Sequence, residues 1–137
     1  MSDADGAPAP VPTTPRVLCD VKALTTLAPG SAGALWKLAE SGRQLDANVV
    51  HLPPHQRVDT HSEPDLDVLL LVVSGEGTLR SPHRPQRLAE GTLLWLPHGS
   101  ARSITAGERG LFYLTVHRRR PGMRIGRREG DPGPDVA

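Results

Sequence analysis

The chain has 137 residues, which is enough for one domain with a single core. Hydrophobic residues make up 37% and the 14 glycines follow no period of three, so a wholly disordered chain and a collagen-like one are both excluded. The net charge is +1, and two Trp, one Tyr and one Phe offer few platforms for stacking bases, so we expect no nucleic-acid partner. The single cysteine permits no internal disulfide and no cysteine-rich zinc site.

No segment of the chain has the pattern of a membrane anchor or a signal peptide. The longest uninterrupted apolar run covers residues 68–73, far short of the roughly 20 residues of a membrane-spanning helix. The N-terminus carries acidic residues where a secretory signal needs a basic start and an apolar middle. We therefore expect a cytoplasmic protein without a membrane partner. The abundance of arginine, alanine, glycine and proline is typical of a bacterial source.

Composition divides the chain into a central domain and two arms. Residues 1–15 are rich in proline and small residues, and they cannot bury enough apolar area to offset the entropy of ordering. Residues 121–137 combine prolines, glycines and charges in the same way. We expect a flexible arm at 1–15, one folded domain at 16–120 and a flexible tail rich in Arg, Gly and Pro at 121–137.

Period-2 patterns dominate the central domain and indicate an all-β fold. Asp20 is placed to cap a short helix over 21–27, which the Ala-Pro-Gly sequence at 28–30 would end. Residues 35–39 fit a strand or a helical turn, and we favour the strand. Turn residues separate short alternating segments about 8 to 12 residues apart, the spacing of a β-sandwich or small barrel. The predicted strands are 35–39, 44–52, 67–73, 78–81, 88–96, 101–105 and 111–118.

The segment from 55 to 77 resembles the first signature motif of the cupin superfamily, which runs from a glycine through His-x-His and a glutamate to a closing glycine. His61 and Glu63 fall on the two histidine positions, and Gly75 falls on the closing glycine. Val68 stands where the glutamate belongs, with Asp67 beside it. The first motif is therefore matched only in part.

The segment from 91 to 106 resembles the second cupin motif. Gly91, Pro97 and Gly99 match it, whereas Arg102 stands in place of the histidine and Ala106 in place of the asparagine. The resemblance spans residues 33–118. It implies a cupin-type double-stranded β-helix, that is, a jelly-roll barrel flanked by the two disordered arms.

Cupins that hold iron, zinc, nickel or manganese usually present three histidines and one glutamate to the barrel interior. By this resemblance, the metal ligands left here are His61 and Glu63, with Asp67 as a further candidate if the alignment shifts by one residue. Arg102 stays charged in proteins and would repel a cation at that position. We therefore expect no cofactor, with a divalent metal as the alternative.

The same residues suggest a different site. An alternating strand would place His61 and Glu63 on one face, and the resemblance brings Arg102 into the same cavity. We expect Glu63 and Arg102 to form an ion pair with His61 hydrogen-bonded nearby, because buried charges need partners. This trio is either an inherited polar plug or a site where Arg102 binds a carboxylate or phosphate and His61 transfers a proton. Whether His117 faces inward stays open.

These observations leave three functional hypotheses. The first is a metal-poor cupin that binds a small anionic molecule in its barrel through His61, Glu63 and Arg102, with no residue assigned to catalysis. The alternative is a metal-dependent enzyme of the dioxygenase or isomerase type that uses His61 and Glu63. The third is a non-catalytic dimeric interaction module. The resemblance also implies a homodimer.

Overall fold

A computed structural model of the chain describes residues 13–27 and 32–120. Residues 1–12 and 121–137, which hold most of the predicted arm and all of the predicted tail, lie outside the described residues, as does the predicted helix end at 28–30. Within the described part, no helix is long and apolar enough to cross a membrane. The elements are α1 (Val21–Leu27), β1 (Gly33–Lys37), β2 (Leu45–Leu52), β3 (Arg57–Ser62), β4 (Val68–Arg80), β5 (Gln86–Ala89), β6 (Leu93–Leu96) and β7 (Ala101–Arg118).

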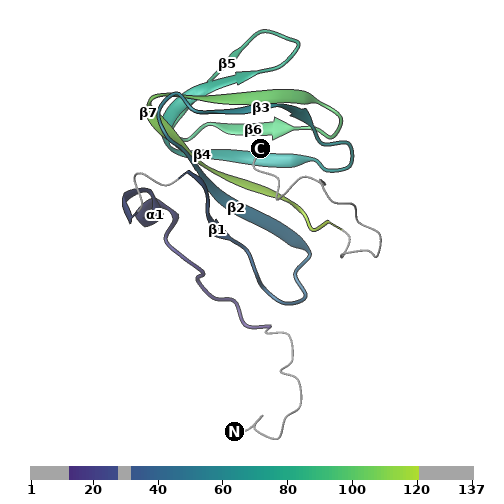
Figure 1. Cartoon of the computed structure of the whole chain (residues 1–137). Coiled ribbons are helices and arrows are strands. Elements are labelled where there is room, and N and C mark those ends of the chain that lie inside the picture. The colour runs from purple at the N-terminus through teal and green to yellow at the C-terminus, as the bar shows by residue number, and fades with distance from the viewer. Residues whose placement is uncertain (1–12, 28–31, 121–137) are drawn as a thin grey trace, which may run out of the picture.

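All seven strands belong to one antiparallel sheet that folds over on itself (Figure 1). The path through the sheet is β1-β2-β7-β4-β5, with β3 added to β7 and β6 added to β4. The long strands β4 and β7 run through both halves of the folded sheet. One half contains β1, β2 and β6 with the start of β4 and the end of β7. The other half contains β3 and β5 with the remaining parts of β4 and β7.

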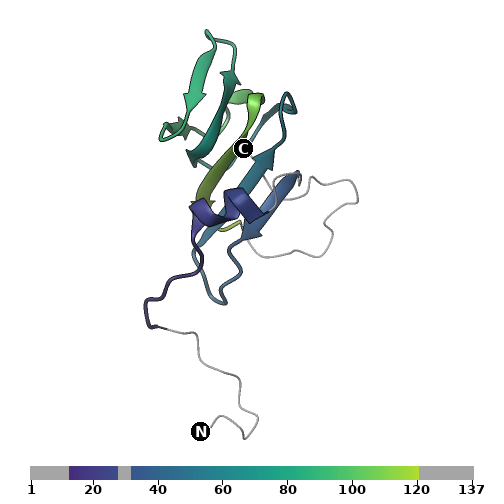
Figure 2. The same cartoon turned by 90° about the vertical axis from the view of Figure 1, so that its left-hand side faces the viewer.

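The one helix among the described residues, α1, begins where the sequence predicts. The Asp20 carboxylate accepts a hydrogen bond from the backbone N–H of Ala23 at 3.2 Å, which satisfies one of the unpaired donors of the first turn. Lys22 Nζ donates to the Val73 carbonyl of β4 at 3.3 Å. This contact holds α1 against the outside of the sheet (Figure 2).

Two long strands replace four of the predicted short ones. The predicted strands 67–73 and 78–81 form β4, and those at 101–105 and 111–118 form β7. The turn predicted at 74–77 is a bulged bend, because the β4–β7 register shifts on both sides of Gly75. Gly75 has φ of 86°, and a Cβ there would overlap the carbonyl oxygen of Gly110. This glycine permits close approach of two strands, a role that sequence alone does not distinguish from a turn.

Two further differences concern where strands begin and end. The single strand predicted at 88–96 is two strands, because β5 ends at Ala89 and β6 begins at Leu93 after a turn that contains Gly91, with φ of 89°. The predicted strand at 35–39 is confirmed as β1, two residues earlier. Strand β3 is absent from the predicted strands, since its polar sequence Arg-Val-Asp-Thr-His-Ser shows no apolar alternation.

The core lies between the two facing halves of the sheet. Alternate positions of β2, β4, β6 and β7 point inward, so aliphatic side chains from both halves meet there. The only aromatic residue in this cluster is Tyr113, which is fully buried. The buried cluster consists of Val50, Leu52, Val68, Leu70, Val72, Leu79, Leu88, Leu94, Leu96, Ile104, Ala106, Leu111 and Tyr113.

Candidate functional site

The inward-facing positions change from apolar to polar toward one end of the folded sheet. In the half that holds β2, the inward face of β7 continues from Tyr113 to Thr115 and then His117. Thr115 is the Cα partner of Asn48, and His117 is the partner of Asp46. Asn48, Thr115 and His117 are all buried. The apolar core therefore gives way to hydrogen-bonding groups at the end where β2 begins and β7 finishes.

The facing half becomes polar at the same end. Val58 of β3 pairs with the core residue Ile104 of β7, and after an irregularity in register His61 pairs with Arg102. Arg102 is 1% exposed, which makes it the largest fully buried side chain in the described residues. His61 is half-buried, and its Nδ1 donates to the Asp59 carbonyl at 3.3 Å. The polar end of the interior thus holds Arg102 and His61 side by side.

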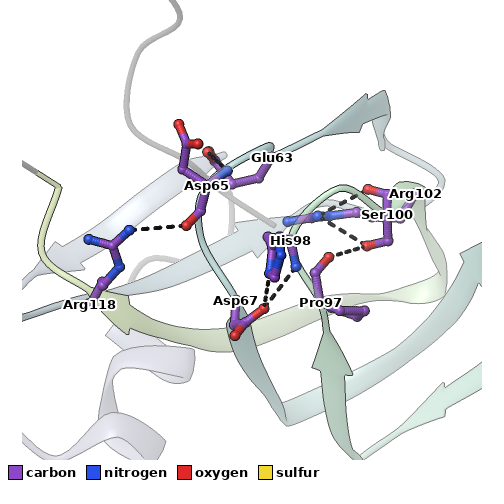
Figure 3. Close-up of polar contacts among 8 residues, drawn as sticks. All are labelled: Glu63, Asp65, Asp67, Pro97, His98, Ser100, Arg102 and Arg118. Carbon is purple, nitrogen blue, oxygen red and sulfur yellow. Dashed lines mark hydrogen bonds and ion pairs between the residues drawn. The ribbon is translucent and has the colours of Figure 1, made fainter.

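The turn between β6 and β7 positions the Arg102 guanidinium. Arg102 Nη1 lies 3.2 Å from the Ser100 carbonyl oxygen and 3.4 Å from Ser100 Oγ (Figure 3). Ser100 Oγ in turn donates to the Pro97 carbonyl at 2.7 Å. The backbone N–H of Gly99 donates to the carbonyl of Glu63 at 2.7 Å, which ties this turn to the segment after β3. The motif residues Pro97 and Gly99 therefore shape the turn that orients Arg102.

Glu63 lies just after β3 and is paired with a residue that the sequence analysis did not select. Its Oε1 accepts a hydrogen bond from Arg120 Nη2 at 2.5 Å, and its Oε2 accepts one from the backbone N–H of Asp65 at 3.3 Å. The predicted partner, Arg102, acts on Glu63 through its charge, whereas the ion pair that the structure gives Glu63 is with Arg120. Burial acts to raise the pKa of Glu63, but the hydrogen bonds from Arg120 and Asp65 and the charges of Arg120 and Arg102 outweigh it and leave that pKa lowered.

Asp67 lies at the surface and stabilises the turn between β6 and β7. Its Oδ1 accepts hydrogen bonds from the backbone N–H of His98 at 2.9 Å and from His98 Nδ1 at 2.8 Å (Figure 3). These two bonds, together with the charges of His98 and Arg118, lower the pKa of Asp67. Asp67 thus connects the start of β4 to the turn that carries Ser100.

The structure decides the direction of His117, which the sequence left open. His117 is 5% exposed, and its Nδ1 lies 2.7 Å from the Arg118 carbonyl oxygen. Because a carbonyl only accepts, Nδ1 carries the proton, and in the neutral ring Nε2 keeps its lone pair. A recess of about 210 Å³ opens at this end, lined by Lys37, Leu38, Arg43, Asp46, Ala47, Asn48, His117 and Arg120.

The donor set at this end does not fit a metal ion of the kind that cupins bind. Within residues 13–27 and 32–120, no group of three or more His, Cys, Asp or Glu side chains converges. The carboxylate of Glu63 is held by Arg120, and that of Asp67 is held by His98. The buried cation Arg102 stands opposite His61, where it would repel a bound metal.

Three polar residues at this end escaped the sequence analysis. Arg120 lies at the border of the segment predicted as a tail. Asn48 and Thr115 lie in strands whose sequences are mainly apolar. The predicted strand at 111–118 already contains Thr115, and alternation from the buried Tyr113 places Thr115 inward. The sequence did not fix which face of this strand is buried, so this signal could not be used.

Comparison with known proteins identifies the fold. No protein-family model matches the chain, and no curated protein matches it. Among solved structures, KdgF from Halomonas sp. is similar with a TM-score of 0.56 at 20% identity, over 63% of this chain and 77% of that one. A cupin-2 domain containing protein from Shewanella frigidimarina has a TM-score of 0.53 at 17% identity, over 63% and 82%. The DMSP lyase DddQ from Ruegeria pomeroyi has a TM-score of 0.56 at 23% identity, over 64% and 47%.

These three structures match the folded sheet and share too little sequence to carry more than architecture. They agree with the all-β arrangement. The chain has the fold of the cupin superfamily.

Proposed function

We propose that the protein binds a small anionic molecule at the polar end of its folded sheet, with Arg102 as the residue that holds the negative charge. The observation that carries the proposal is the guanidinium of Arg102, inward-facing and 1% exposed. A guanidinium stays charged and presents a planar fork of donors that matches a carboxylate or a phosphate.

The surrounding charges favour an anion. Glu63, the acidic side chain beside Arg102, is neutralised by Arg120. The charges of Arg120 and Arg102 both act on this carboxylate, so an anion bound at this end would meet two guanidinium groups. Attraction between opposite charges strengthens where water is excluded, so a buried site of this sign binds anions more firmly than an exposed arginine does.

The neighbouring residues give the ligand a size and an orientation. His61 lies opposite Arg102 on the same face and supplies an imidazole that can hydrogen-bond to a bound anion. The recess of about 210 Å³ at the same end, which is lined by His117 and Arg120 among others and not by Arg102 or His61, has room for a small metabolite rather than a polymer. Cys19 is a free thiol, and free thiols are typical of proteins located in the reducing cytoplasm.

Calorimetric titration with acetate, succinate and inorganic phosphate tests this proposal. We expect saturable binding of at least one anion, a loss of about 10- to 100-fold in affinity in Arg102→Met, and partial retention in Arg102→Lys. Arg87→Met, which removes an exposed arginine of β5, is the matched control and should bind as the wild type does. Binding that is unchanged in a folded Arg102→Met variant, or no binding of any anion by the wild type, would overturn the proposal.

A further inference from the structure

The recess at the start of β2 is built by three neighbouring strands. His117 of β7 is the Cα partner of Asp46 of β2, and Lys37 of β1 is the partner of Asn48, so these four residues share the inward face of the sheet. All four line the recess, which has a volume of about 210 Å³. Arg102 does not line it, so this space is separate from the site of the proposed function.

His117 is the buried side chain of the recess with a nitrogen left for a ligand. It is 5% exposed, and its Nδ1 donates to the Arg118 carbonyl at 2.7 Å, which makes Nε2 the acceptor of the neutral ring. Nε2 has no hydrogen-bond partner among the described residues, and the one fully enclosed side-chain atom without a partner there is the Thr115 hydroxyl oxygen. Nε2 is therefore not enclosed by protein, and it opens into the recess that His117 lines.

The charged side chains around the recess favour an anion. Three of the lining residues, Lys37, Arg43 and Arg120, are cations, whereas Asp46 is an acid. Asp46 accepts a hydrogen bond from Arg43 Nε at 2.8 Å, and Arg120 pairs with Glu63. Lys37, by contrast, is exposed and has no ion pair among the described residues. An anion in the recess would meet the Lys37 ammonium as a charge that no carboxylate of these residues offsets.

A cation and a neutral acceptor beside one small space restrict the ligand. The Lys37 ammonium donates to a negatively charged oxygen, but the lone pair of His117 Nε2 repels such an oxygen and needs an O–H group. Hydrogen phosphate offers both, because it is an anion that keeps a P–O–H group. Sulfate has the same tetrahedral shape and no proton to donate, so its binding would leave Nε2 without a partner.

We propose that this recess is a second ligand site, which binds a small oxyanion that carries its own proton, with Lys37 holding the charge and His117 Nε2 accepting the O–H. The site goes beyond the proposed function and does not depend on Arg102. A phosphate monoester loses its last proton at a pKa of about 6, so in mildly alkaline solution it lacks the O–H that the free ion keeps. The site therefore selects free phosphate over both sulfate and phosphate esters.

Nitrogen-15 NMR of the histidine rings tests this site at about pH 8, where imidazole groups are neutral. The Nε2 resonance of His117 is assigned through the backbone, and phosphate, sulfate or methyl phosphate is added to the wild type. We expect phosphate to shift this resonance saturably, and the other two anions to need a concentration at least about tenfold higher. No shift with phosphate, or an equal response to phosphate and sulfate, would overturn the proposal.

Lys37→Met tests the role of the positive charge, with the same resonance of His117 as the readout. We expect this variant to bind phosphate about 5- to 30-fold more weakly. Lys22→Met is the matched control, because Lys22 is the other lysine of the chain and its ammonium contacts Val73 and Glu90. It should bind phosphate as the wild type does. Equal affinity in Lys37→Met and Lys22→Met would contradict the assignment of Lys37.

Arg102→Met separates this site from the site of the proposed function. Phosphate should still shift the Nε2 resonance of His117 in this variant, because Arg102 does not line the recess. A response of His117 that disappears in the folded variant would place the phosphate at Arg102 and overturn the second site. Failure of the proposed function is different, since then His117 responds to phosphate while no anion affinity depends on Arg102.

Discussion

His61 and Arg102 are direct Cα partners across β3 and β7, so an imidazole and a guanidinium lie side by side at the polar end of the interior. In the metal-binding members of the fold family, the position of Arg102 belongs to a histidine. The exchange places a permanent positive charge where a metal ligand would stand. The same geometry that would hold a cation is thereby suited to an anion.

Restoring a histidine at this position should restore metal affinity. We predict that Arg102→His binds Ni²⁺ or Zn²⁺ at least about tenfold more tightly than the wild type, because two imidazoles then face each other across neighbouring strands beside Glu63. Metal titration followed by elemental analysis of the dialysed protein measures the change. A wild type that already retains one equivalent of metal would contradict the assignment of Arg102 as an anion ligand.

The Glu63–Arg120 pair should make stability depend on pH in the acid range. The pKa of Glu63 is lowered in the folded protein, so its contribution is present above the pKa of the unfolded chain and is lost as pH falls through the lowered value. We predict that the melting temperature falls between about pH 5 and pH 3, with a shallower slope in Glu63→Gln. Glu108→Gln, an exposed site on β7, should keep the wild-type slope.

Asp67 should raise the affinity for the anion although its side chain lies at the surface. Removing its carboxylate in Asp67→Ala frees the turn that contains His98, and this turn carries the Ser100 atoms that orient Arg102. We predict faster amide hydrogen exchange at residues 97–100 and a loss of about 3- to 10-fold in anion affinity, with little change in overall stability. Asp65→Ala, which removes an exposed carboxylate in the same loop, is the control. Unchanged amide hydrogen exchange and anion affinity in Asp67→Ala would show that Asp67 does not stabilise the turn.

Gly75 and Gly91 have almost the same φ, 86° and 89°, but different surroundings. A Cβ at Gly75 would overlap the backbone of Gly110, whereas a Cβ at Gly91 meets nothing within 4 Å. We predict that Gly91→Ala destabilises the protein by about 1–2 kcal/mol, the cost of the left-handed conformation. Gly75→Ala should cost more than about 4 kcal/mol or prevent folding. Equal losses in urea unfolding would contradict the close approach of β4 and β7.

The sequence predicted the fold class and the location of most strand residues, because the glycine and proline motifs and the period-2 patterns are local. It misread the bend at Gly75 as a turn, since a glycine that admits a neighbouring strand leaves no distinct local signal. The pairing of Glu63 with Arg120 could not be predicted from a local sequence pattern either, because the two residues lie 57 positions apart. His61 and Arg102, by contrast, were selected together from the family motifs and are neighbours in the structure.

Nitrogen-15 NMR of the arginine side chains tests the role of Arg102 most directly. The Nε–H resonance of Arg102 is identified by its loss in Arg102→Lys, and succinate is then added to the wild type. We predict a saturable shift of this resonance, while those of the exposed Arg87 and Arg109 stay in place. A resonance of Arg102 that does not move while succinate binds elsewhere would contradict the account.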